Sequence, residues 1–280
     1  MKLICGDLRK TIMGDMVDLL ITSPPYNCGK DYNSISDELS YEDYWSFTCG
    51  WVSSAYEALK SGGRMVVNLP WWMMKKPRRD VPGKFKQVAE MIGFKYLDKI
   101  IWIKGDEKNQ NVSGGWGGGG SGWGTYMSPS GPAIRCASEP ILVFAKEKRG
   151  RGRISGKGNG DCIKGDITKE EFLSWTIDVW FIRGEHDKMH PAVFPKEIPT
   201  RLIKLYTYPG ETVMDPFMGS GRVGEACIET AREFIGIEKD PAFYQYAKSR
   251  IDGAKYNQSL DLIAKSRGKS ANALFAKETL

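Results

Sequence analysis

A short apolar run, Val17 to Ile21, leads through Thr22 and Ser23 into two consecutive prolines, Pro24 and Pro25. Such a run is typical of a strand buried on both faces of a sheet. Proline has no N–H to donate, so the strand must end there, at the edge where open α/β sheets place ligands. The Ser23 hydroxyl, the proline-stiffened carbonyls and the Tyr26 ring suit a flat, polar-edged molecule such as a nucleobase. A proline-rich turn without a ligand is the alternative interpretation.

The chain of 280 residues is long enough to bury a large core and fits one elaborated α/β domain, or a domain with a small lobe. No apolar run approaches the roughly 20 residues of a membrane span, and we find no signal-peptide pattern. The six cysteines are scattered without C-x-x-C spacing. Scattered thiols favour a reducing cytoplasm as the location.

Most of the formal net charge of +6 lies between residues 146 and 169, where eight basic residues accompany three acidic ones. A basic, glycine-rich segment on a near-neutral body favours a polyanion partner, because phosphate contacts release counterions. A solvated surface loop is the alternative. The candidate DNA contacts are Lys148, Arg149, Arg151, Arg153 and Lys157.

Two further stretches have an unusual composition. Residues 105–132 form a glycine-rich run interrupted by Trp116, Trp123 and Tyr126. Because aromatic rings stack on bases, this run is either a loop that contacts DNA or covers the substrate, or a flexible spacer. A second basic cluster comprises Lys75, Lys76, Arg78, Arg79 and Lys84.

Apolar periodicity and turn residues predict alternating strands and helices. A helix opens at Ser40 with a Ser-x-x-Asp capping pattern. Expected strands are Leu3–Cys5, Val17–Ile21, Arg64–Leu69, Tyr96–Lys104, Glu139–Lys146, Glu211–Met214 and Phe234–Ile237. Other expected helices are Leu8–Met13, Gly83–Ile92, Pro195–Tyr206, Arg222–Arg232 and Pro241–Ile251. His186 and His190 have the spacing of a helical metal pair, but Pro191 and the lack of matching ligands disfavour a metal site.

The stretch from Asp215 to Glu238 has the order of a nucleoside-binding unit: strand, glycine turn, helix, strand and acidic end. Its glycines also fit the dinucleotide spacing G-x-G-x-x-G, so an NAD enzyme is a competing interpretation. However, the Asp215 carboxylate would repel a phosphate and attract a cationic amine or sulfonium. S-adenosylmethionine therefore fits better than a dinucleotide.

Together, the two stretches resemble the DNA amino-methyltransferases in a circularly permuted order, with the catalytic motif before the cofactor motif. Thr22 to Tyr26 matches the catalytic motif, which assigns catalytic roles to Ser23, Pro24, Pro25 and Tyr26. The cofactor-binding residues that the resemblance implies are Asp7, Asp215, Pro216, Phe217, Gly219, Ser220, Gly221, Glu238, His190 and Pro191. The segment from Arg135 to Lys146 resembles the strand before the target-recognition region. Arg222 and Val223 depart from the small hydroxyl residues that many relatives carry, and a cation there could assist the methionine carboxylate.

The resemblance implies an α/β fold of the class I S-adenosylmethionine-dependent methyltransferase type, a Rossmann-like, mostly parallel seven-stranded sheet with one antiparallel strand. It covers a catalytic domain over residues 1–252, with a target-recognition insert at about 105–190, followed by a polar tail over 253–280. The implied partner is double-stranded DNA with a flipped base. A cognate restriction endonuclease and a homodimer are both compatible with the sequence.

Serine at the head of the motif is, within this family, more often associated with cytosine N4 than with adenine N6. The sequence therefore favours N4 methylation of cytosine, with N6 methylation of adenine as the alternative. An RNA or protein methyltransferase shares the Pro-Pro-Tyr chemistry, but there the cofactor motif normally comes first. A non-catalytic DNA-binding module is the remaining alternative, which intact Ser23, Tyr26, Asp215 and Glu238 disfavour.

Overall fold

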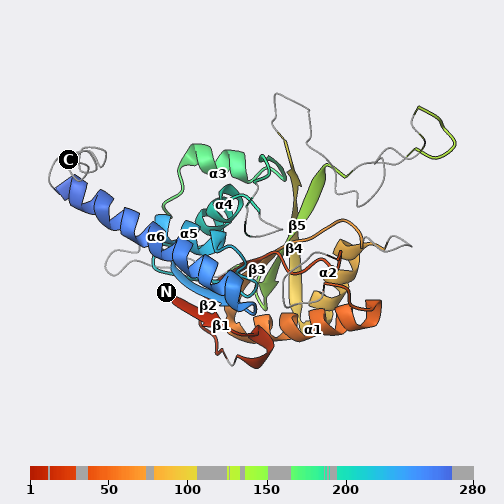
Figure 1. Ribbon diagram of the computed structural model, residues 1–280, viewed down its shortest axis with the longest axis horizontal. Coiled ribbons are helices and arrows are strands. Elements are labelled where there is room, and N and C mark those ends of the chain that lie inside the picture. Colours follow the sequence, from red (N-terminus) through yellow and green to blue (C-terminus); the bar gives the residue numbers. More distant parts are fainter. Residues whose placement is uncertain are drawn as a thin grey trace.

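The computed structural model describes residues 1–11, 13–29, 37–73, 79–105, 125, 127–132, 136–150, 165–185, 187, 189 and 194–266. These residues form one eight-stranded sheet in the order β1-β8-β7-β2-β3-β5-β4-β6 (Figure 1). The strands are β1 (Lys2–Cys5), β2 (Val17–Thr22), β3 (Leu59–Asn68), β4 (Phe94–Ile103), β5 (Ser138–Lys146), β6 (Val179–Phe181), β7 (Thr212–Asp215) and β8 (Glu233–Glu238).

The sheet is parallel except for β5, which runs antiparallel to both of its neighbours, β3 and β4. This confirms the mostly parallel sheet with one antiparallel strand. The expected number of seven strands is wrong, because β6 adds an eighth strand at the edge and pairs in parallel with β4. β6 has only three residues, too few for a periodic apolar pattern, and its place depends on pairing between distant residues, Trp102 opposite Trp180.

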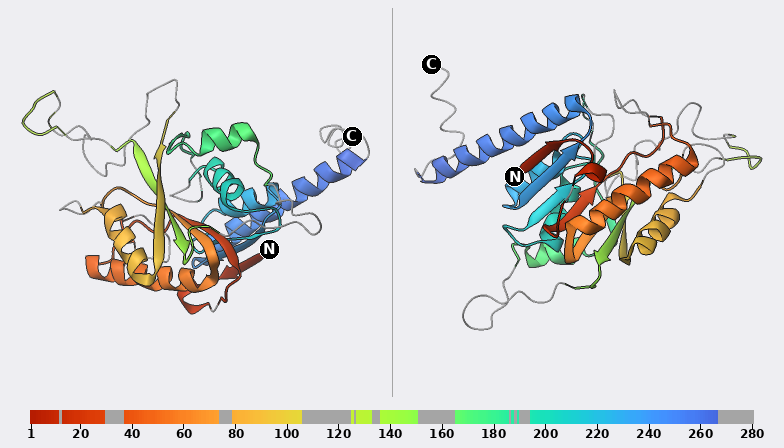
Figure 2. Two further views of the ribbon diagram at one scale, coloured as in Figure 1. Left: turned by 180° about the vertical axis from the view of Figure 1, so that it is seen from behind. Right: turned by 90° about the horizontal axis from the view of Figure 1, so that it is seen from below.

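Helices cover both faces of the sheet, as Figures 1 and 2 show. On one face, α1 (Tyr41–Ala58) and α2 (Val81–Ile92) bury a core that includes Trp51 and Phe85. On the other face, α4 (Glu197–Tyr206), α5 (Arg222–Glu229) and α6 (Pro241–Ser266) bury a second core. The short helix α3 (Lys169–Trp175) lies beside α4. The two cores hold the strands in one rigid layer, so their ends keep fixed positions.

Local signals place most helix boundaries. Ser40 caps α1 through its hydroxyl, which accepts the Asp43 N–H at 3.0 Å, so the predicted cap is confirmed. Gly93 ends α2 with φ +119°, a left-handed conformation that glycine adopts without steric cost. Three predicted helices differ most in extent. The first is a 3₁₀ turn over Leu8–Lys10 only, α5 ends at Glu229 rather than Arg232, and the helix expected to end at Ile251 continues to Ser266.

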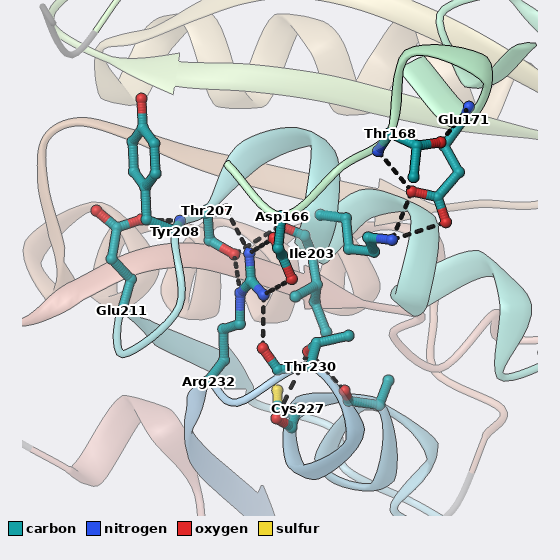
Figure 3. A network of polar contacts seen from close by, with 12 residues as sticks. Asp166, Thr168, Glu171, Ile203, Thr207, Tyr208, Glu211, Cys227, Thr230 and Arg232 are labelled. Atoms are coloured by element: carbon teal, nitrogen blue, oxygen red, sulfur yellow. Dashed lines mark hydrogen bonds and ion pairs between the residues drawn. The ribbon is translucent and has the colours of Figure 1, made fainter. Parts of the chain in front are cut away.

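A buried arginine joins several elements at the amino-terminal edge of β7 and β8 (Figure 3). The Arg232 side chain is fully buried, and its guanidinium donates to both Asp166 oxygens, at 2.6 and 2.7 Å. It also donates to the Thr207 carbonyl and the Thr230 carbonyl, at 2.6 and 2.5 Å. Beside it, Glu171 of α3 pairs with Lys204 of α4. This network anchors the segment that leads into α3, and it lies at the edge opposite the carboxyl ends of the parallel strands.

Among the described helices, none is both long enough and apolar enough to cross a membrane. The described cysteines, Cys5, Cys28, Cys49, Cys136 and Cys227, are all free thiols.

Candidate active site

Both predicted motifs lie at the same edge of the sheet. β2 is buried along its whole length and pairs with β7, so the chain leaves both strands at neighbouring positions. The Thr22 hydroxyl donates to Asp215 Oδ1 at 2.8 Å, across 193 residues of sequence. The Phe217 N–H donates to the same oxygen at 3.1 Å. The catalytic motif and the cofactor motif are therefore in direct contact.

Asp215 is the most strongly perturbed acid of this edge. Its pKa is raised from 3.8 to about 7, chiefly by burial and also by the Glu238 carboxylate, against the two hydrogen bonds to Oδ1, which lower it. Burial likewise raises the pKa of Glu238. Two buried carboxyl groups at one edge favour a cationic ligand, because its charge would stabilise their ionised forms.

The turn after β2 is held rigid by hydrogen bonds to a side chain of α1 and to the residues just before α1. The Tyr44 hydroxyl donates to the Pro25 carbonyl at 3.1 Å, and burial raises the pKa of Tyr44. Asn27, at φ +54°, exchanges two hydrogen bonds with the Leu39 backbone. Asp37 accepts the N–H groups of Asn27 and Cys28, at 2.8 and 2.9 Å. Pro24 is buried, so the Ser23-to-Tyr26 turn has one fixed shape.

The Tyr26 hydroxyl is at the centre of a polar cluster. Ser23 Oγ donates to it at 3.0 Å, and Asn68 Nδ2 donates to it at 2.9 Å. The Tyr26 hydroxyl in turn donates to Glu139 Oε2 at 3.1 Å. Glu139 also accepts from Asn68 Nδ2 at 2.7 Å and forms an ion pair with Lys104. These residues lie at or just after the ends of β2, β3 and β4 and at the start of β5, and they meet here because β5 runs opposite to the others.

An open pocket lies against this cluster, and its empty space, including the solvent at its mouth, is about 480 Å³. Tyr26, Trp71 and Trp72 supply aromatic surface, and Lys104 and Glu139 supply charge. Trp71 is held by its indole N–H, which donates to the Ser138 hydroxyl at 3.1 Å. Aromatic walls with a few polar groups are what a nucleobase requires, since rings stack on its faces and polar groups bind its edge.

The predicted cofactor loop folds against Glu238 and α6. Gly219 and Gly221 have φ of +51° and +82°. The Gly219 N–H donates to Glu238 Oε2 at 2.8 Å, and the Met218 N–H donates to the Ile237 carbonyl. A Cβ at Gly221 would lie 3.1 to 3.2 Å from Ala247 of α6. The loop is thus tightly packed. Pro216, Phe217 and Ser220 lie within it, between Asp215 and Gly221. The Phe217 ring packs edge-on against Trp51, with centroids 5.4 Å apart.

Asp7 also lies at this edge, because the Gly6 N–H donates to the Glu238 carbonyl at 2.8 Å. Its carboxylate, however, is held by Arg9, whose Nε and Nη2 donate to it at 3.0 and 2.5 Å. This hydrogen bond from Arg9 holds the pKa of Asp7 below its usual range. The structure therefore places Asp7 near Glu238, and the Asp7 carboxylate is already paired with Arg9.

Arg222, the departure from the family motif, is engaged elsewhere. Its guanidinium pairs with Glu185 at 2.7 Å and with Glu225 at 3.0 Å. The expectation that this cation assists the methionine carboxylate is therefore not supported, because two carboxylates already neutralise it. Nearby, Arg250 of α6 pairs with Asp187 at 2.6 Å, which fixes the chain at residue 187.

Some predicted site residues lie elsewhere or outside the described residues. Lys148 and Arg149 are exposed beyond the carboxyl end of β5. Since β5 is antiparallel, this is the edge opposite the candidate site, so the structure does not bring them to it. His190, Pro191, Arg151, Arg153 and Lys157 fall outside the described residues. The same holds for Trp116, Trp123, Tyr126, Lys75, Lys76, Arg78, Arg135 and His186.

Sequence reasoning missed the partners of Tyr26. Asn68 ends β3, and Glu139 is the second residue of β5, inside the segment that resembles the strand before the target-recognition region; the sequence assigned neither residue a role. The available signal was that each of these two polar residues stands next to a continuous run of apolar strand residues. Only the order of the strands in the sheet shows that both lie beside Tyr26. No group of three or more histidine, cysteine, aspartate or glutamate side chains that could hold a metal ion occurs in the part of the chain that the structure describes.

An α/β sheet whose carboxyl edge joins a Ser-Pro-Pro-Tyr turn, an aromatic pocket and a glycine loop with buried acids defines a nucleotide-modifying enzyme of the methyltransferase class. The N6_N4_Mtase family model, described as DNA methylase, matches residues 17–249, so the chain belongs to this family.

Individual relatives agree with the family match. Type II methyltransferase M.MjaVI of Methanocaldococcus jannaschii is 36% identical over 65% of this chain and 84% of its own length. Type II methyltransferase M.BglI of Bacillus subtilis is 27% identical over 98% of this chain and 88% of its own. Among solved structures, the putative DNA modification methylase TTHA0409 of Thermus thermophilus, complexed with S-adenosyl-L-methionine, superposes with a TM-score of 0.67 and 26% identity, covering 90% of this chain and 93% of that chain.

Proposed function

We propose that this DNA methyltransferase of the N6/N4 family uses S-adenosylmethionine to methylate the exocyclic amino group of a base flipped out of duplex DNA, with cytosine N4 as the target. The observation that carries this proposal is the contact between Thr22 and Asp215, which joins the base-binding turn to the cofactor loop. A methyl donor and an acceptor amino group bound at the two motifs would be neighbours.

S-adenosylmethionine is the cofactor that fits the loop. When bound, it supplies a methyl group on a positively charged sulfonium. The buried acids Asp215 and Glu238 suit its positive charge and its ribose hydroxyls, and the tight Gly219–Gly221 turn brings backbone close to the ligand. The complexed Thermus thermophilus relative supports this choice.

The turn after β2 supplies the base-binding groups. An exocyclic amino group is a poor nucleophile, because its lone pair is delocalised into the ring. The Pro24 carbonyl and the Ser23 oxygen can each accept one amino hydrogen, which turns the nitrogen lone pair toward the methyl group. Tyr26 stacks on the base, so positioning and desolvation supply most of the rate enhancement.

The choice of cytosine N4 rests on serine, rather than aspartate, at position 23. Adenine N6 is the alternative with the same mechanism. Methylated DNA digested to nucleosides identifies the product, and N6-methyladenine alone would refute the cytosine assignment.

Transfer of labelled methyl groups to DNA, RNA and protein, measured in parallel, tests the substrate class. We expect label in DNA only. Label in RNA or protein alone would favour another methyltransferase class, and no label in any of them would favour a non-catalytic DNA-binding module.

Variants of the turn test the site assignment. Ser23→Ala and Tyr26→Ala should reduce transfer by about a hundredfold while S-adenosylmethionine still binds, because each removes a contact to the base and neither removes a residue of the cofactor loop. Isothermal titration of the cofactor is the matching control. Unchanged turnover in both variants would refute the assignment.

Several broader expectations belong to the same proposal. Circular permutation of the motifs and a catalytic domain over residues 1–252 agree with the motif order and with the family match to residues 17–249. DNA contact by Arg151, Arg153 and Lys157 rests on their charge, whereas Lys148 and Arg149 lie at the edge opposite the site and are not proposed to contact the DNA bound there. A cognate endonuclease would make the chain part of a restriction-modification system, a homodimer is compatible with it, and the free cysteines favour a cytoplasmic location.

A further inference from the structure

The cluster around Tyr26 contains a carboxylate that neither motif includes. Glu139 lies at the start of β5, is 8% exposed and bonds Tyr26, Asn68 and Lys104. The chemistry of a hydrogen-bond chain depends on which group donates at each link, and an ionised carboxylate can only accept. Glu139 therefore dictates the direction of every bond connected to it.

The consequence can be followed from Glu139 to Ser23. The single hydrogen of the Tyr26 hydroxyl points to Glu139 Oε2 at 3.1 Å, and the Asn68 carbonyl, at 3.5 Å, is a second group that can only accept. The Tyr26 oxygen must then act as an acceptor toward Asn68 Nδ2 and Ser23 Oγ. The Ser23 hydrogen is thereby committed to Tyr26, and the Ser23 lone pairs remain for another donor.

The amide of Asn68 supports the same direction. Its Nδ2 donates to both Tyr26 and Glu139, while its Oδ1 is buried without a hydrogen-bond partner in the described structure. A buried acceptor without a partner is unfavourable, so the amide would turn over if Glu139 could donate. The Asn68 amide keeps its orientation because the Glu139 carboxylate can only accept hydrogen bonds.

We infer that Glu139, held by Lys104, is a positioning residue that sets the direction of the Glu139–Tyr26–Ser23 hydrogen-bond chain, so that Ser23 presents lone pairs to the amino group of the target base. This inference rests on the proposed function and assigns Glu139 a role at the same site. It explains how serine, which can donate or accept, serves as an acceptor where the amino hydrogens require one.

The decisive variant is Glu139→Gln. The Lys104 ammonium can only donate, so it holds the amide oxygen and turns the amide NH2 toward Tyr26. The Tyr26 hydroxyl then has no carboxylate acceptor, and its hydrogen is shared between Ser23 and an Asn68 amide that has turned its Oδ1 over. The Ser23 hydrogen is therefore no longer committed to Tyr26 and can point at the base. We expect kcat to fall by about tenfold or more, the factor that a lost hydrogen bond of about 1.4 kcal/mol gives. KM for DNA and the Kd for S-adenosylmethionine should stay unchanged.

Two further variants separate this role from a structural one. Lys104→Met in the Glu139→Gln background frees the amide to turn its oxygen toward Tyr26, so kcat should recover in part. Tyr26→Phe keeps the ring and removes the hydroxyl, so adding Glu139→Gln to it should cause no further loss. Glu147→Gln, an exposed position past the other end of β5, is the matched control and should behave as the wild type.

The outcomes distinguish this inference from the proposed function. If the wild type transfers no methyl group to DNA, the proposed function fails and the inference fails with it. If the wild type is active, three results would each overturn the inference alone: Glu139→Gln with unchanged kcat, a loss of kcat that Lys104→Met does not relieve, or losses that multiply in the Tyr26→Phe background.

Discussion

Replacing Asp215 with asparagine should stabilise the fold at neutral pH while weakening cofactor binding. Both hydrogen bonds to the carboxyl group, from the Thr22 hydroxyl and the Phe217 N–H, end on Oδ1. An asparagine Oδ1 accepts both, so the substitution removes the ionisable group without removing its contacts. The variant therefore isolates the free energy of placing a charge at this buried position.

The magnitude follows from the pKa of Asp215, which burial raises from 3.8 to about 7. Below pH 3.8 the carboxyl group is protonated in both the folded and the unfolded chain. Between that pH and about 7 the unfolded chain loses its proton and the folded chain keeps it, so the free energy of unfolding decreases. Above that range the loss is complete, at about 4 kcal/mol for a shift of about three pKa units.

Urea unfolding from pH 4 to pH 8 measures this effect. We expect the free energy of unfolding of Asp215→Asn, relative to the wild type, to rise by about 3 to 4 kcal/mol over this range. Thr22→Val is the companion variant. It removes a hydrogen bond that lowers the pKa of Asp215, so the stability of this variant should go on decreasing to a higher pH than that of the wild type.

Cofactor binding should show the linked change. A cationic cofactor favours the ionised carboxylate, so S-adenosylmethionine should bind the wild type more tightly as pH rises toward 7 and then reach a plateau. Asp215→Asn should bind weakly with no such pH dependence. If the stability of the wild type and that of Asp215→Asn change in parallel with pH, the reasoning about burial is wrong.

Two other positions give sharp expectations for stability. Arg232→Met should lower the free energy of unfolding by about 2–4 kcal/mol, because it leaves Asp166 and the Thr207 and Thr230 carbonyls without their donor. Below the transition temperature its methyl transfer should match the wild type, since the network lies opposite the site; a loss of kcat without a loss of stability would contradict this. Gly221→Ala and Gly210→Ala have similar φ, +82° and +84°, but only Gly221 has a neighbour, Ala247 at 3.1 Å. Thermal unfolding should show a cost of about 1–2 kcal/mol for Gly210→Ala and about 1–3 kcal/mol more for Gly221→Ala. Equal losses of stability in the two variants would mean that α6 moves to accommodate the added methyl group.

The structural features that depend on a few neighbouring residues could be predicted from the sequence. A run of apolar residues predicted β2, and the missing N–H of Pro24 and Pro25 predicted its end. The acid–glycine order predicted the loop after β7. These features depend on backbone chemistry within a few residues, so the sequence by itself determined the parallel α/β class, the turn at Ser23 to Tyr26 and the loop from Asp215 to Gly221.

Only the tertiary structure decided which polar groups meet. Tyr26 bonds Glu139 across 113 residues because β5 runs antiparallel and places its first residues, not its last, at the site. The same reversal sends Lys148 and Arg149 to the opposite edge. Arg222 pairs with Glu225 in its own helix and also with Glu185, and the second pairing depends on where the chain before α4 meets α5. Charged side chains have many partners of suitable chemistry along the chain, and only strand order and direction select among them.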